Sequence, residues 1–158
     1  MGFINPLFND SDITNGKISK PKSIKPTKQI RSTRSDKTHN IKFPVDPIVQ
    51  MKLKSLCKQG KRIYRLQGKG DLKQTKFNTL LLTYGLKHKE LVHWNHHYKD
   101  TKVYMHTQLL ENEYELLIGG PHGIAIQMNL SERKVVFQIM MSVLKWIEGG
   151  NSDLEEII

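Results

Sequence analysis

Hydrophobic and polar residues alternate in two short stretches that lie about sixty residues apart. In the first stretch the positions predicted to face inward are Ile41, Phe43 and Val45. In the second they are Val103, Met105, Thr107 and Leu109. A period of two is typical of a strand with one buried face. Each stretch therefore predicts a short β-strand, with its polar residues on the opposite face.

Two segments of helical periodicity follow the first predicted strand. Asp46-Pro47 offers an N-cap and a proline at the first helical position, and Gly60 is predicted to end this first helix. Its apolar stripe comprises Ile48, Met51, Leu53, Leu56 and Cys57. A long basic loop with two glycines follows, and a second helix is expected from about Leu72 to His88.

The same order of elements recurs after the second predicted strand. A helix is expected over about residues 112–118, a small strand at Ile124, Ile126 and Met128, and a longer helix from Ser131 to Gly149. Element order and apolar phase thus predict a degenerate internal repeat, residues 40–90 and 101–149.

The first unit resembles the ribbon-helix-helix family of MetJ, Arc and plasmid copy-control repressors. The residues that carry the resemblance are Ile41-Lys42-Phe43-Pro44, Asp46-Pro47, Leu53, Leu56, Phe77, Leu80-Leu81 and Tyr84-Gly85-Leu86. Two features depart from the family pattern. The segment between the helices, residues 58–71, is long, and Lys73 stands where the family often has a capping Ser or Thr, a position that Ser131 fills in the second unit.

The resemblance implies a mostly α-helical fold with short ribbon strands, built from tandem ribbon-helix-helix units. A lone strand and two helices cannot bury their apolar faces, whereas two paired strands with four helices can. The two strands pair within one chain, as a pseudo-symmetric single-chain dimer, or each pairs with its copy in a second molecule. The predicted organisation is a disordered basic arm (1–38), a first unit (39–90), a linker (91–100), a second unit (101–149) and an acidic tail (150–158).

Charge is unevenly distributed along the 158 residues, whose formal net charge is +10. Residues 1–40 carry +5, residues 41–90 carry +9 and residues 91–158 carry −4. Cations at this density repel one another unless a polyanion neutralises them, and nucleic acid is the commonest such partner. The composition therefore favours a nucleic-acid-binding protein.

Strand alternation and helix starts select the residues expected to contact DNA. In the ribbon, the outward positions are Asn40, Lys42 and Pro44, and Lys102, Tyr104, His106 and Gln108. At the helix starts, the candidates for phosphate contact are Lys73, Gln74, Thr75 and Lys76, and Ser131, Arg133 and Lys134. On the basic loop they are Arg62, Arg65 and Lys69. Lysine pairs with guanine edges, and asparagine or glutamine pairs with adenine.

Other chemistries find little support in the sequence. Cys57 is the single cysteine, and no stretch resembles a signal peptide or a membrane span. The histidines at positions 88, 93, 96 and 97 lack a complementary ligand set for zinc, so a linker is the preferred interpretation. No nucleophile with a base is recognisable. We therefore expect no enzymatic activity, no bound metal and no cofactor.

These patterns predict a sequence-specific double-stranded DNA-binding protein. The resemblance implies that it is a transcriptional regulator, of the repressor type, whose β-ribbon enters the major groove. The resemblance implies a prokaryotic, plasmid- or phage-borne repressor that is cytoplasmic and associated with the nucleoid. Its expected partners are double-stranded DNA and itself. The alternatives are an accessory or architectural DNA-binding protein of the partition or relaxosome type, and a nonspecific basic nucleic-acid or RNA binder.

Overall fold

The computed structural model describes residues 32, 34–150 and 154–158. The chain divides into Met1–Ser32 and Thr33–Ile158, and the second of these units is described below. Most of the predicted arm, residues 1–38, lies outside the described residues. Thr38 already begins the first strand, and the carbonyl oxygen of Lys37 accepts a hydrogen bond from the Glu111 backbone N–H at 2.9 Å. Among the described residues, no helix is long and apolar enough to cross a membrane.

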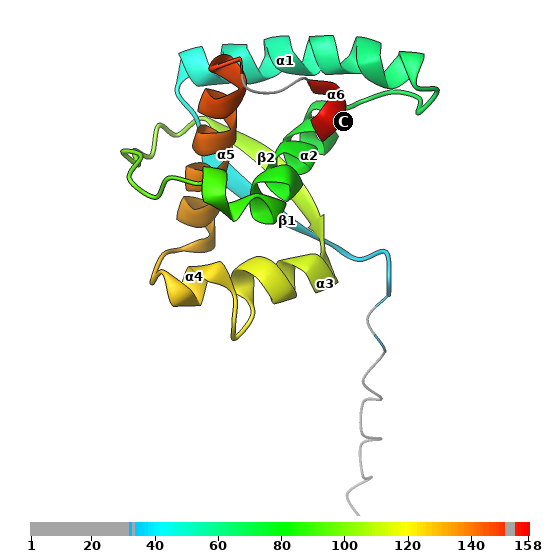
Figure 1. Cartoon of the computed structure of the whole chain (residues 1–158). Coiled ribbons are helices and arrows are strands. Elements are labelled where there is room, and N and C mark those ends of the chain that lie inside the picture. Colours follow the sequence, from blue (N-terminus) through cyan, green and yellow to red (C-terminus); the bar gives the residue numbers. More distant parts are fainter. Residues whose placement is uncertain (1–31, 33, 151–153) are drawn as a thin grey trace, which may run out of the picture. The chain divides into compact units, whose positions relative to one another are not determined.

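The described unit is mostly helical with one two-stranded sheet, as predicted (Figure 1). Its first half contains β1 (Thr38–Pro44), α1 (Pro47–Leu66), α2 (Gln74–Lys87) and the 3-10 turn η1 (Lys89–Leu91). Its second half contains β2 (Tyr104–Leu110), α3 (Glu111–Tyr114), the π-helical segment η2 (Glu115–Gly119), α4 (Ile124–Gln127), α5 (Glu132–Glu148) and α6 (Leu154–Ile157).

The two strands pair with each other within the chain as an antiparallel ribbon, one of the two arrangements that the sequence left open. Ile41 lies opposite Thr107, and Phe43 lies opposite Met105. All four side chains are buried, together with Leu109. Period-two alternation therefore identified the inner face correctly, except at Val103, which precedes β2 and is 39% exposed.

Helices α2 and α5 cross over the inner face of the ribbon and close the core. They pack against each other at Gly85, where a Cβ atom would meet the side chains of Ile139 and Val143. Helix α2 also packs on β2, and α5 packs on β1. Figure 1 shows α1 on one side of this centre and α3 with α4 on the opposite side.

The first helix is longer than predicted. It continues through Gly60 to Leu66 because Gly60 is buried inside the helix, where a Cβ would lie 3.3 Å from both Leu72 and Phe77. The glycine serves close packing, and the loop shortens to residues 67–73. The buried stripe also differs from the prediction, since Ile48 and Met51 are 63% and 65% exposed.

The second half contains one further correction. The predicted strand at residues 124–128 is wrong, because this segment forms the helical turn α4, in which the Met128 N–H donates to the Ile124 carbonyl at 2.9 Å. The predicted helix at residues 112–118 is confirmed by α3 and η2. The long helix starting at Ser131 is confirmed by α5, whose first turn Ser131 caps through a 3.4 Å contact from the Lys134 N–H to its Oγ.

The histidine-rich segment is held against α5 by hydrogen bonds. The backbone N–H of His93 donates to Ser142 Oγ at 2.9 Å, and that of His96 donates to Gln138 Oε1 at 3.0 Å. Gln138 Nε2 donates back to the His96 carbonyl at 2.8 Å. Ser142 and Gln138 are both buried, so these hydrogen bonds hold the segment that connects the two halves against α5. Across the described ranges, no group of three or more His, Cys, Asp or Glu side chains is placed to hold a metal ion.

Candidate nucleic-acid interface

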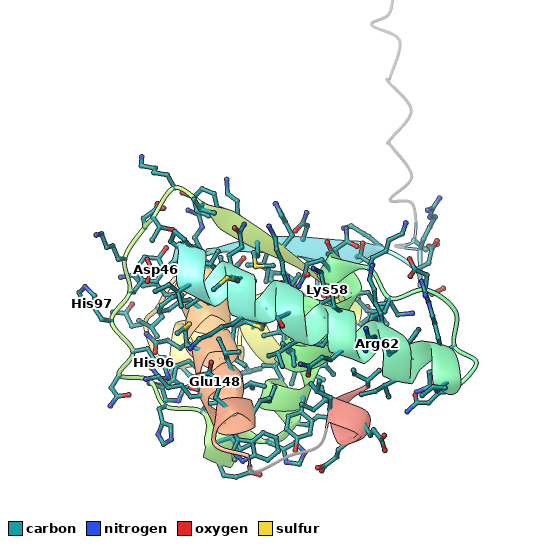
Figure 2. All side chains as sticks on the ribbon, turned by 90° about the horizontal axis from the view of Figure 1, so that it is seen from above. Asp46, Lys58, Arg62, His96, His97 and Glu148 are labelled. Atoms are coloured by element: carbon teal, nitrogen blue, oxygen red, sulfur yellow. The ribbon has the colours of Figure 1, made fainter. Side chains whose placement is uncertain are left out.

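At the centre of the outer face of the ribbon lie four exposed polar side chains, Asn40, Lys42, His106 and Gln108, here called the outer tetrad. Asn40 lies opposite Gln108, and Lys42 lies opposite His106. A 3.3 Å contact between Asn40 Oδ1 and His106 Nδ1 joins the two pairs diagonally. Figure 2 shows side chains projecting from the ribbon on the side away from α2 and α5. Residues that were predicted to face outward, from separate halves of the sequence, thus lie together on one surface.

Polar side chains of α2 hold the outer edge of β2 in place. Asn78, only 1% exposed, donates from Nδ2 to the His106 carbonyl at 3.1 Å, and its Oδ1 accepts from Gln74 Nε2 at 3.0 Å. Thr79 Oγ1 accepts from the Gln108 backbone N–H at 2.8 Å. These bonds satisfy edge groups that a two-stranded ribbon otherwise leaves unpaired. The sequence analysis missed them, although the polar pair Asn78-Thr79 interrupts the apolar run of α2 and is the signal that could have revealed them.

The start of α2 flanks the tetrad on the β2 side. Lys73 is the N-cap residue, and its side chain makes no capping hydrogen bond. Lys76 is exposed, with its Nζ 5.0 Å from the centre of the Tyr64 ring. Thr75 is half-buried. The N-cap and first turn of α2 therefore combine backbone N–H groups that no side chain caps with two lysines, a combination that suits an anion.

The start of α5 lies next to the ribbon across an open groove of about 1030 Å³. Asn40, Lys42 and His106 line it from the ribbon, and Ser131 and Arg133 line it from α5. Three of the four tetrad residues and the start of α5 thus share one groove, which is open to solvent.

Asp100 partly neutralises Arg133 at the start of α5. Arg133 lies 3.9 Å from Asp100, and its guanidinium stands 5.3 Å from the centre of the Tyr104 ring. The Tyr104 hydroxyl donates to Asp100 Oδ1 at 2.6 Å, and this bond lowers the pKa of the Asp100 carboxyl while raising the pKa of Tyr104. Lys134 remains exposed, with its Nζ 5.5 Å from the centre of the Tyr98 ring.

Two of the predicted outward ribbon residues are placed differently. Pro44 is buried, so its predicted exposure is wrong. It lies directly opposite Tyr104, and directly opposed side chains share one face, so the large ring stands beside the proline. Lys102 is exposed but precedes β2, in the left-handed backbone region at φ 62°. Its placement on a strand was therefore wrong as well.

The three cations assigned to the basic loop are placed mainly on a helix. Arg62 and Arg65 are exposed on the last turns of α1, and Lys69 lies in the turn that follows. Lys69 Nζ donates to the backbone oxygen of Ile158 at 2.9 Å. Arg65 approaches Asp71 at 3.7 Å. The two arginines thus lie on a helix and not on the basic loop that the sequence suggested.

Comparison with known proteins assigns no relative to this arrangement. No family model matches the chain, and no curated protein or solved structure does. Inferences about function therefore depend on the geometry and charge of the ribbon face.

Proposed function

We propose that this protein binds double-stranded DNA in a sequence-specific manner, with the outer face of the ribbon in the major groove, and that it acts as a transcriptional regulator. The observation that carries the proposal is the outer tetrad, exposed on an antiparallel ribbon between the starts of α2 and α5. In this proposal the chain is a single-chain counterpart of a ribbon-helix-helix dimer. Each half supplies one strand of the ribbon and one long helix of the core.

The dimensions of the ribbon support this mode of binding. The major groove is about 12 Å wide and admits a two-stranded β-ribbon. The ribbon of seven residues per strand extends for about 23 Å at roughly 3.3 Å per residue. Helix starts beside such a ribbon would lie near the phosphates that border the groove.

The chemistry of the tetrad supports base contacts. Lys42 suits the O6 and N7 acceptors of guanine, whereas Asn40 and Gln108 suit the donor and acceptor of adenine. His106 donates or accepts according to its tautomer. The four side chains differ from one another, so the preferred sequence should not be palindromic even though the ribbon has approximate two-fold symmetry.

Selection of bound duplexes from a random pool tests the proposal. We expect a short enriched sequence, and we expect Lys42→Ala to weaken binding to it by about 1–3 kcal/mol, with a much smaller effect on a scrambled duplex. Lys89→Ala, an exposed cation on η1, serves as the matched control. Failure to enrich any sequence would refute sequence-specific binding, and equal losses on both duplexes would make Lys42 a phosphate contact. A footprint on the gene's own upstream region would then support the regulatory role.

A further inference from the structure

Helix α1 carries six lysines and arginines and no acidic residue. Four of these cations, Lys54, Lys58, Lys61 and Arg65, recur at intervals of four, three and four residues. At 3.6 residues per turn, this spacing places them along one line on the helix surface. They are here called the α1 stripe.

The α1 stripe lies on the edge of the helix that faces the ribbon side of the molecule. The core face of α1 is formed by Leu53, Cys57, Gly60 and Tyr64. One edge next to it carries Lys52, whose Nζ is 2.6 Å from Glu148 of α5. The stripe occupies the other edge. Figure 2 shows Lys58 on the side of α1 nearer the ribbon and Glu148 beyond the opposite side.

Little within the described residues neutralises the stripe. Arg65 approaches the exposed Asp71 at 3.7 Å, whereas Lys54, Lys58 and Lys61 form no ion pair with any described side chain. Like charges four residues apart on a helix repel each other. A polyanion beside the stripe would remove this repulsion, which is the physical basis for expecting one there.

Helix α3 on the opposite flank of the ribbon is acidic, although the exposed Lys37 there lies 3.3 Å from Glu111. Helix α3 with η2 carries Glu111, Glu113 and Glu115 and no lysine or arginine. Figure 1 shows α1 and α3 on opposite sides of the ribbon. The two halves therefore share an order of elements but present very different surfaces to a duplex that extends past the ribbon on both sides.

We propose, on the basis of the DNA-binding function above, that the α1 stripe binds phosphates on its own side of the ribbon and that the acidic helix α3 supplies no such contacts on the other side. The stripe extends for about 16 Å, the rise of eleven helical residues. One DNA strand presents a phosphate for about every 3.4 Å of axial rise. A duplex would thus be held asymmetrically, in a single orientation, with phosphate contacts that extend further on the α1 side.

Two double variants of equal charge change test this inference. Lys54→Ala with Lys58→Ala removes two exposed cations of the stripe. Lys87→Ala with Lys89→Ala removes two exposed cations at the C-terminal end of α2. The helix has 14 residues, so this end lies about 20 Å from the first turn, which is the part of α2 proposed to face DNA. Alanine retains high helix propensity, so both proteins should fold. Circular dichroism and the thermal midpoint would establish that they do.

The probes are a duplex enriched by the selection described above and a scrambled duplex of the same length. On the enriched duplex, hydroxyl-radical footprinting of the unchanged protein should show protection that extends further on one flank. The stripe variant should lose that extension, and the slope of log K against log salt should become shallower by up to about 0.9 for each lost contact, or about 2 in total. The control variant should change neither quantity.

The outcomes separate the inference from the proposed function. An enriched duplex with a symmetric footprint, or equal slopes for the stripe and control variants, would overturn the inference and leave the DNA-binding function intact. Absence of binding to any duplex would overturn both. Equal affinity for single-stranded RNA of matched length would identify the stripe as a general polyanion surface and would also contradict oriented binding to a duplex.

Discussion

Asn78 of α2 donates a hydrogen bond from its side-chain amide to the backbone carbonyl oxygen of His106 on β2, over 3.1 Å. Asn78 is buried, whereas the His106 side chain is exposed on the opposite face of the ribbon. A residue of the core thus sets the position of a residue proposed to contact DNA. Helix α2 and the ribbon are coupled through this bond, and its energetic contribution can be measured.

Replacement of Asn78 should therefore affect stability and binding together. Asn78→Ala removes the donor to His106 and the acceptor for Gln74, and an unpaired buried polar group costs about 1–3 kcal/mol. Urea denaturation should show a loss of this size, with Asn95→Ala, an exposed asparagine, as the control. Equal midpoints for the two variants would show that this bond does not stabilise the fold.

The crossing of α2 and α5 should not tolerate a larger residue at Gly85. A Cβ there would lie 2.9 Å from Val143 Cγ2 and would also meet Ile139, both buried residues of α5. Overpacking of a core of this kind typically costs about 1–3 kcal/mol. Gly85→Ala should lower the free energy of unfolding by that amount, although alanine favours a helix. Thr83→Ala on the same helix is the control, and a Gly85→Ala protein of unchanged or greater stability would contradict close packing at this crossing.

Stability should fall in mild acid because of His96. Burial is the largest cause that lowers the pKa of this imidazole below its usual 6.5, followed by the charges of Lys145 and His93. Its Nε2 lies 3.0 Å from Ser142 Oγ, and its Nδ1 lies 3.3 Å from Lys145 Nζ. The unfolded chain therefore binds the proton at a higher pH than the folded chain. The contribution of neutral His96 to the free energy of unfolding is complete above about pH 6.5. It declines as the pH falls toward the lowered pKa of His96 in the folded state.

Denaturation of His96→Asn and His97→Asn between pH 7.5 and pH 5 would isolate this contribution. The His96→Asn protein should lose less stability across the range than the unchanged protein does. His97 is exposed, so the His97→Asn protein should retain the original dependence. Identical pH profiles for all three proteins would contradict a role for His96.

The basic N-terminal segment should contribute to affinity through its charge. Residues 1–32 hold six lysines and arginines and two aspartates. If they contact phosphates, their deletion should make the slope of log K against log salt shallower by about 0.9 for each lost contact. The free energy of unfolding of Thr33–Ile158 should not change. A slope that is the same with and without the segment would remove it from the interface.

Local patterns in the sequence were sufficient for much of the fold. Alternation placed Ile41, Phe43, Met105 and Leu109 on the buried face of the ribbon because strand side chains point to opposite faces in turn. Asp46-Pro47 and Ser131 marked the starts of α1 and α5 because helix starts need particular backbone angles, although only Ser131 caps its helix with a side-chain hydrogen bond and Asp46 makes none. These are properties of a few consecutive residues, so no other part of the chain has to be known.

Other features were decided by contacts between residues far apart in the chain. Gly60 has the local character of a helix end, but Leu72 and Phe77 pack against it and the helix continues. Pro44 occupies an outward position in the strand pattern, but Tyr104 lies opposite it and it is buried. The hydrogen bond from Asn78 to His106 and the pairing of the two strands within one chain both depend on the packing of α2 against β2. The composition of a segment limits which structures it can form, whereas its long-range partners determine which of them buries the most apolar surface without leaving polar groups unpaired.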